Sequence, residues 1–304
     1  MRNSFISRLS LERSKNKKVF LLTGDLGFSV LESFEKKFQN SFINVGIAEQ
    51  NMISIAAGLA LEKFKVFTYS IVNFTTSRCH EQIKNDICYH NLDVTITAVG
   101  AGFPYGSQGY THHGIEDITI MRVLPNMTIY NPADRFELEF CFNEIINNEG
   151  AKYLRLARGG EPVVHHRKIT TKKKSIIVKK PETTNILCSG TILKNCLDAA
   201  NELVKENKNI GLISCPIISN KIEKYLIKIL TKSKVIVTVE EHSKSGGFGS
   251  FIGEIINRNK LKCELIILGV ETNNYSLIGS QEYLRNKNKI DTKSIIKILK
   301  SCYK

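Results

Sequence analysis

Apolar runs that resemble β-strands alternate with helical patterns along most of this 304-residue chain. In the first half, the strand-like runs occupy residues 19–25, 42–47, 65–70, 94–100, 127–132 and 152–157. Continuous apolar strands separated by helices are typical of a mostly parallel sheet that helices cover on both faces. The first half is therefore predicted to form a doubly wound α/β domain.

This alternation stops in the middle of the chain. Residues 161–184 are polar and basic and contain two prolines, so they are predicted to form a linker with room for a short strand. A second series follows, with strand-like runs at 185–190, 210–215, 234–241 and 263–270 and helical patterns at 192–206, 220–232, from about 248, and at 292–303. The expected fold class is α/β, with two doubly wound domains (1–160 and 185–304), each a mostly parallel sheet flanked by helices.

The composition is that of a globular protein without a membrane segment. An apolar fraction of 42% can fill a sizeable core, and no apolar run approaches the roughly 20 residues that span a bilayer. The N-terminal residues lack the apolar stretch of a secretory signal. The eight cysteines are scattered singly and form no C-x-x-C pair, which argues against a zinc site or a disulfide framework. Reduced thiols in a cytoplasmic protein are expected.

The formal net charge of +14 points to nucleic acid or to anionic small molecules as partners. The lysines are spread along the chain, however, and no basic stripe interleaved with aromatic residues occurs. Neither nucleic acid nor a membrane is therefore an expected partner, and small anionic molecules are left as the expected ligands.

Three exits from predicted strands carry polar residues that are candidates for chemistry. Asp25 and Ser29 lie between glycines in TGDLGFS, and Glu49 opens the small-residue helix that follows FINVGI. By itself, an acid at either position is also explained as a helix cap or a complement to the helix dipole. The third exit leads into the long, glycine-rich loop AGFPYGSQGYTHHGIEDI, and loops of this length are usually functional or disordered. Adjacent histidines seldom point to one metal, so ligand hydrogen bonding is favoured over a metal site.

Four segments occur in an order and spacing that is specific to one family. NVGIAEQNMISIAAGLA, GYTHHGIEDITIMRVLPNMTIYNPAD, YLRLARG and VIVTVEEHSKSGGFGSFIGEII resemble the C-terminal half of the transketolase family. That family includes 1-deoxyxylulose-5-phosphate synthases and, more distantly, the β subunits of 2-oxoacid dehydrogenases. The resemblance runs from about residue 2 to 300. It implies a thiamine-diphosphate pyrimidine-binding domain followed by the family's C-terminal domain.

One element of a complete transketolase is missing. An additional N-terminal domain in the family carries a Gly-Asp-Gly segment, then an Asn, which bind Mg²⁺ and the diphosphate of thiamine diphosphate. This chain has no such segment and no room for one before residue 19. The resemblance therefore implies one subunit of a split transketolase. A separate N-terminal subunit is expected to supply the Mg²⁺ ligands, in a 2+2 heterotetramer.

The resemblance also assigns roles around the cofactor. Glu49 matches the glutamate that contacts N1′ of the aminopyrimidine, and a carboxyl sharing that proton makes the neighbouring 4′-imino group a better base. Phe74 matches an aromatic that stacks on the aminopyrimidine, and Asp25 matches an acid near the thiazolium. His112 matches a histidine beside the thiazolium and the reacting carbonyl, where it can bond substrate oxygens or relay protons. Glu49 and His112 are thus the predicted catalytic residues.

The substrate side keeps some family residues and alters others. Arg158, Ser29 and Arg2 match positions that hold a substrate phosphate, and a guanidinium suits phosphate through its forked donors. Gly100 stands where many transketolases have a phosphate-binding histidine. Gln108 stands where they have an aspartate that reads a sugar hydroxyl. Donor binding is therefore expected to be kept and the acceptor side to be changed.

Three functions remain open at this point. The leading one is transfer of a two-carbon ketol unit from a ketose phosphate to an aldose, which the THHGIED and LARG segments favour. The alternatives are a β-type subunit of a thiamine-dependent 2-oxoacid decarboxylase or dehydrogenase, and a non-catalytic assembly subunit. The retained trio Glu49, Phe74 and His112 argues against a purely structural subunit.

Overall fold

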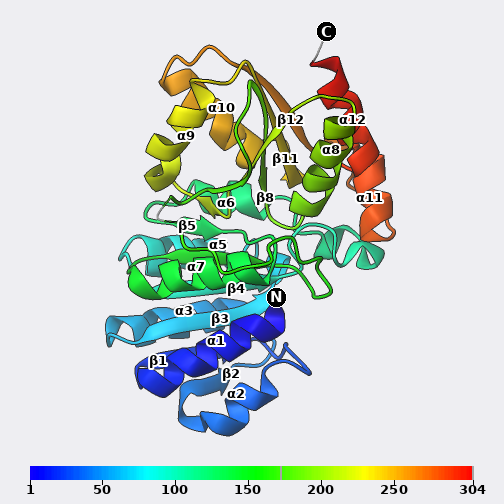
Figure 1. The fold of residues 1–304 in the computed structure, drawn as a ribbon. Helices are drawn as coiled ribbons and strands as arrows, with labels where there is room; N and C mark the ends of the chain where they lie inside the picture. The colour runs from blue at the N-terminus through cyan, green and yellow to red at the C-terminus, as the bar shows by residue number, and fades with distance from the viewer. Residues whose placement is uncertain (172, 303–304) are drawn as a thin grey trace.

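The computed structural model describes residues 1–171 and 173–302 and places two α/β units one above the other (Figure 1). In the first unit, six parallel strands make up most of a sheet with the order β10-β5-β6-β4-β3-β1-β2. These strands are β1 Val19–Thr23, β2 Phe42–Asn44, β3 Lys65–Ile71, β4 Val94–Val99, β5 Thr128–Tyr130 and β6 Lys152–Leu156. The helices that accompany them are α1 Arg2–Lys15, α2 Glu32–Lys37, α3 Glu49–Leu61, α4 Val72–Thr75, α5 His80–Gln82, α6 Asp117–Arg122 and α7 Arg135–Asn147.

The second unit has a five-stranded sheet with the order β12-β11-β8-β9-β7. Its strands are β7 Ile176–Lys179, β8 Thr184–Ser189, β9 Gly211–Ser214, β11 Val235–Ser243 and β12 Glu264–Val270. Its helices are α8 Leu193–Lys205, α9 Glu223–Leu230, α10 Phe248–Arg258, α11 Gln281–Lys287 and α12 Thr292–Ser301. Two mostly parallel sheets flanked by helices confirm the predicted fold class. Tyr303, the last residue of the predicted final helix, lies outside the described residues.

The sequence pattern explains most of these elements. Every residue of β4 and of β6 is buried, as a strand covered on both faces requires. In α8, the buried residues recur at helical spacing and form one apolar stripe; they are Leu193, Cys196, Ala199, Ala200 and Leu203. All eight cysteines lie within the described residues and are free thiols. Of the described helices, none is long and apolar enough to cross a membrane.

Two elements were not predicted. Helix α1 buries only Phe5, Ile6 and Leu9, so its pattern is too polar to stand out. Phe5 packs on the sheet with its ring centroid 6.0 Å from that of Phe67. The other element is the two-residue strand β10, Ile217–Ile218, which comes from the second unit and pairs antiparallel with β5 at the edge of the first sheet. The two units are therefore joined by a strand as well as by the connection.

Candidate active site

The residues singled out in the sequence lie beyond the carboxyl ends of the first sheet's strands. Asp25 and Ser29 follow β1, Glu49 opens the helix after β2, and Phe74 follows β3. His112 belongs to the loop after β4, and Arg158 follows β6. Parallel strands end at one edge of a sheet, and ligands of doubly wound folds bind there. The topology therefore brings together residues that are far apart in the chain.

Glu49 is a buried acid with an arginine as its partner. Its residue is only 2% exposed, and Arg78 Nη1 donates a hydrogen bond of 2.6 Å to its Oε2. Within the described part of the chain, Arg78 is the only hydrogen-bond partner of this carboxylate, so Glu49 does not cap α3. The Arg78 guanidinium also lies 4.7 Å from the centroid of the Phe74 ring. Sequence reasoning missed Arg78, because α4 ends at Thr75 and no helical spacing relates Arg78 to Phe74.

A continuous line of side chains leads from Phe74 to Arg158. The rings of Phe74 and His112 meet edge to face with centroids 5.3 Å apart. His112 meets Tyr105 in the same way at 6.2 Å, and the Arg158 guanidinium lies 5.4 Å from the Tyr105 ring centroid. His112 thus lies between the buried acid at one end and the Arg158 cation at the other. Tyr105 is a second residue that sequence reasoning missed.

The cationic end opens into a pocket of about 400 Å³. Its lining contains all three residues predicted to hold a substrate phosphate, Arg2, Ser29 and Arg158, together with residues such as Tyr69 and Tyr105. Helix α1, which the sequence did not predict, begins at Arg2 and brings this side chain to the pocket.

Three buried polar atoms at this pocket have no hydrogen-bond partner among the described residues. They are Arg2 Nε, the Tyr69 hydroxyl and Ser70 Oγ. Buried polar groups are normally satisfied, so this cluster indicates a place for a polar ligand. Burial raises the pKa of Tyr69 to about 12, although the positive charge of Arg2 acts in the opposite direction. The Tyr69 hydroxyl is therefore a neutral donor near pH 7.

Asp25 and Gln108 lie outside this pocket. Asp25 has a positive φ of 58°, and its Oδ1 accepts a hydrogen bond of 3.0 Å from Asn44 Nδ2. It lines a neighbouring cavity of about 100 Å³. Gln108 is exposed at the end of the 3₁₀ turn Gly106–Gln108. Their predicted roles beside the thiazolium and the acceptor sugar stay predictions.

The two adjacent histidines face different surroundings. His113 is buried, and its Nε2 donates to the Gly106 carbonyl at 3.2 Å within the same loop. Burial lowers the pKa of His113, so it is neutral and holds the shape of the loop. His112 faces Phe74 and Tyr105. Among the described residues, no group of three or more His, Cys, Asp or Glu side chains could hold a metal ion.

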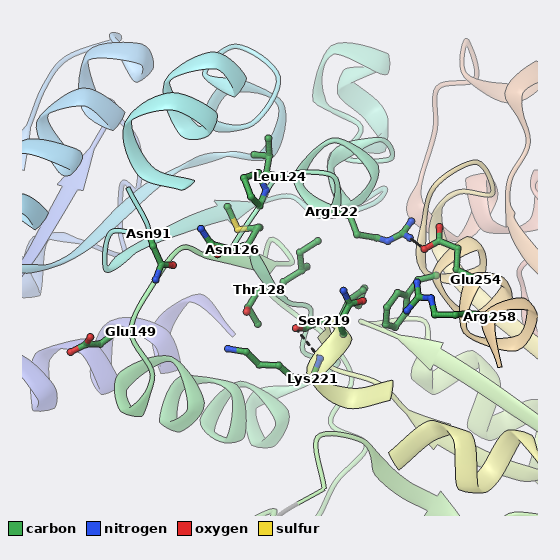
Figure 2. A pocket seen from close by; sticks show the side chains of 16 residues that line it. Asn91, Arg122, Leu124, Asn126, Thr128, Glu149, Ser219, Lys221, Glu254 and Arg258 are labelled. Atoms are coloured by element: carbon green, nitrogen blue, oxygen red, sulfur yellow. Dashed lines mark hydrogen bonds and ion pairs between the residues drawn. The ribbon is translucent and has the colours of Figure 1, made fainter. Parts of the chain in front are cut away.

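Another cavity, of about 510 Å³, lies where the two units meet. Figure 2 shows Arg122 and Glu254 pointing toward each other in this cavity, where they form an ion pair. Arg258, which also lines it, pairs with Glu223 at 2.9 Å. Two of its cations are thus already neutralised, and none of the predicted site residues lines it. The pocket around Arg2 and Arg158 is the better candidate.

Comparisons with known proteins agree with this geometry. Residues 1–160 match the family described as "Transketolase, pyrimidine binding domain", and residues 173–290 match "Transketolase, C-terminal domain". The chain is 31% identical over 264 residues to one of the subunits of an apulose-4-phosphate transketolase from Actinobacillus succinogenes, covering 86% of this chain and 85% of that protein. It is 29% identical over 303 residues to a 6-deoxy-6-sulfo-D-fructose transketolase subunit of Clostridium sp. MSTE9, covering 98% and 92%.

A solved structure is similar over nearly the whole chain. It is described as a split gene transketolase, inactive beta4 tetramer, with a TM-score of 0.86 and 29% identity, and the match covers 99% of this chain and 96% of that one. The resemblance inferred from the four sequence segments is confirmed by these matches. The chain therefore belongs to the transketolase family and consists of that family's pyrimidine-binding domain followed by its C-terminal domain.

Proposed function

We propose that this chain is the C-terminal subunit of a thiamine-diphosphate-dependent transketolase. Together with a separate N-terminal subunit, it transfers a two-carbon ketol unit from a ketose phosphate to an aldose acceptor. The observation that carries the proposal is the line of contacts from the buried acid Glu49, past Phe74 and His112, to the cationic pocket at Arg158. This line provides an acid for the cofactor at one end and cations for a phosphate at the other.

The residues fit the pyrimidine end of the cofactor. When bound, thiamine diphosphate supplies the nucleophilic carbon that takes up the ketol unit. Glu49 would hold a proton at N1′ of the aminopyrimidine, which makes the 4′-imino group a competent base. Phe74 offers a ring face for stacking. Arg78 fixes the Glu49 carboxylate and keeps its charge compensated.

The pocket fits a phosphorylated sugar. Arg2 and Arg158 supply forked donors for phosphate oxygens, and Ser29 supplies a hydroxyl. The unpartnered Tyr69 hydroxyl offers a neutral donor near the same ligand. His112, between this pocket and Phe74, is placed to bond or protonate a substrate oxygen.

The partner subunit is expected to carry the Mg²⁺ ligands and to bind the diphosphate. The relatives named above are subunits of transketolases. The related solved structure, an inactive tetramer of β chains by its description, supports the expectation that this chain is inactive alone. A 2+2 heterotetramer and a cytoplasmic location are part of this proposal.

Reconstitution tests the proposal. The chain is co-purified with the diphosphate-binding subunit of the same organism, and ketol transfer from xylulose 5-phosphate is measured with a panel of aldoses, sugar phosphates and nucleotide-linked sugars. Transfer to at least one acceptor is expected only with both subunits and thiamine diphosphate. Calorimetry on the chain alone is expected to show weak cofactor binding. Tight, Mg²⁺-dependent binding by the isolated chain would contradict the split-subunit assignment.

A further inference from the structure

Two sets of contacts within the first domain hold the loop that carries His112 and Tyr105. We call residues 100–114 the site loop. Its two ends are joined by a pair of backbone hydrogen bonds, from Gly102 N to Gly114 O at 2.8 Å and from Gly114 N to Gly102 O at 2.9 Å. Near Phe74, the Asn73 side chain donates to the carbonyls of Thr111 and His113, each at 3.0 Å. These contacts fix the His112 side of the site loop.

The opposite side of the site loop is held by the C-terminal domain. Glu241, at the carboxyl end of β11, accepts a hydrogen bond of 2.6 Å from Phe103 N. The Gly279 N–H donates to Gly106 O at 3.2 Å, and Figure 1 shows α11 lying next to the loop that follows β4. The rings of Tyr110 and Tyr275 meet at 5.7 Å. Three contacts along the site loop therefore come from the other domain.

Glu241 is itself held rigidly. Arg285 Nε donates to its Oε2 at 2.5 Å, and Gln281 Nε2 donates to its Oε1 at 2.8 Å. Arg285 in turn donates to Asn195 Oδ1 at 3.0 Å and to Thr191 Oγ1 at 3.1 Å. Glu241 is 3% exposed. A buried carboxylate with three donors has one orientation, so the position of Phe103 N is defined by the second sheet.

The approach between the two domains is close enough to require glycine. A Cβ atom added at Gly102 would lie 2.8 Å from Glu241 Cδ, which is closer than real Cβ contacts allow. Gly102 also has a φ of +81°, a conformation that glycine adopts without cost. The close packing of the site loop against Glu241 therefore depends on glycine at position 102.

These contacts fill the place where the second sheet would otherwise bind a ligand. In the order β12-β11-β8-β9-β7, β8 and β11 run parallel, and the chain adds β9 on one side of β8 but β11 on the other. A crevice beyond the carboxyl ends of two strands at such a switch in strand order is the usual ligand site. Here Thr191 follows β8, and the side chains of Arg285 and Glu241 occupy that position together with the site loop.

We propose that Glu241 is a positioning residue of the active site, through which the C-terminal domain sets the placement of Tyr105 and His112. Glu241 does not line the pocket around Arg2 and Arg158. Its effect passes from Phe103 into the 3₁₀ turn at Gly106 and on to the residues that line the substrate pocket. The C-terminal domain thus takes part in catalysis by holding the site loop in a fixed position relative to Arg158 and Phe74.

The neighbouring residue supplies a matched control. Glu240 is equally buried, but it accepts hydrogen bonds from Phe248 N at 2.6 Å and Gly249 N at 2.8 Å, both inside the C-terminal domain. Glu241→Gln and Glu240→Gln are therefore compared in the reconstituted complex. Hydrogen exchange is followed in peptides covering residues 100–114, with kcat/KM for ketol transfer and thermal unfolding measured beside it.

Glu241→Gln is expected to speed exchange in the site loop and to lower kcat/KM by about 10- to 100-fold, the scale of an ångström-sized misplacement. Glu240→Gln is expected to change thermal stability only. Equal loop exchange and equal kcat/KM in the two variants would overturn the proposal. If Glu241→Gln does not fold, Gln281→Ala replaces it, because Gln281 donates to the same Glu241 oxygen that accepts from Phe103 N. Unchanged loop exchange and unchanged kcat/KM in that variant would then overturn the proposal.

The kinetic arm rests on the proposed transketolase function, and the exchange arm does not. If the wild-type complex transfers no ketol unit to any acceptor, the proposed function fails. Site-loop exchange in the two variants then still decides whether Glu241 holds the loop.

Discussion

The ring of Tyr105 lies directly on the backbone of Gly100. Gly100 has a φ of +94°, and a Cβ atom added there would overlap the tyrosine ring. The same ring lines the pocket beside Arg158 and meets His112 edge to face. The position where related transketolases are expected to have a histidine is thus not left open. An aromatic ring from five residues further along the chain takes the space.

This relationship predicts a coupling between the two residues. Gly100→Ala is expected to destabilise the protein, because the new methyl group meets the ring and the positive φ is strained for alanine. In Gly100→Ala/Tyr105→Ala the steric part disappears and the backbone strain remains. A double-mutant cycle on the free energy of unfolding is expected to give a coupling of about 0.5–3 kcal/mol, the range for residues in contact. Additive effects would show that the loop moves the ring away without cost.

The predicted role of Glu49 is tested by Glu49→Gln in the reconstituted complex. The amide is similar in size but cannot share the N1′ proton, so turnover is expected to fall by about 10²- to 10⁴-fold, the usual contribution of acid–base catalysis. Glu223→Gln is the control, since Glu223 is also the first residue of a helix and pairs with an arginine, Arg258. Assembly should be intact in both variants. Near-wild-type turnover of Glu49→Gln would show that Glu49 has only a structural role.

Arg158→Ala is expected to raise the KM of a phosphorylated substrate about ten- to a hundredfold, because charge-assisted hydrogen bonds are worth about 1.5–3 kcal/mol. An unphosphorylated analogue should lose much less. Arg135→Ala is a matched control: Arg135 is also exposed and lies 4.8 Å from an aromatic ring centroid, but it lines a different cavity. An equal rise in KM for both substrates would show that Arg158 has a structural role and does not bind the phosphate.

The sequence was sufficient for features that depend on local pattern. Buried parallel strands appear as apolar runs, and residues at strand ends converge on one sheet edge, so Glu49, Phe74 and Arg158 were found at the expected edge. Features that depend on distant contacts were not predicted. Arg78 meets Glu49 across 29 positions, and Phe103 meets Glu241 across 138 positions. Neither contact leaves a periodic signal in the chain.

The buried acid Glu240 makes stability depend on pH. Burial raises the pKa of Glu240 to about 8, from an ordinary value of 4.5, in spite of the two backbone N–H groups that favour its ionised form. The folded state therefore binds more protons than the unfolded state between these values, and stability falls as pH rises through this window. His242 acts in the opposite direction, because burial lowers its pKa to about 4 from 6.5, and its contribution levels off as pH rises above 6.5, where the unfolded state also loses this proton.

Between pH 6.5 and 8, the wild-type chain is therefore expected to lose stability through Glu240, and Glu240→Gln is expected to lose less. The amide keeps one acceptor oxygen for the N–H groups of Phe248 and Gly249 but turns its NH2 toward the other, so the variant is expected to be less stable at all pH values. The pH dependence of the difference is what reports on titration of Glu240. Thermal unfolding of the two proteins at several pH values in this window checks the prediction. The unfolding temperature of the variant, relative to that of the wild type, should rise steadily from pH 6.5 to 8. A difference that stays constant across the window would mean that Glu240 does not titrate there.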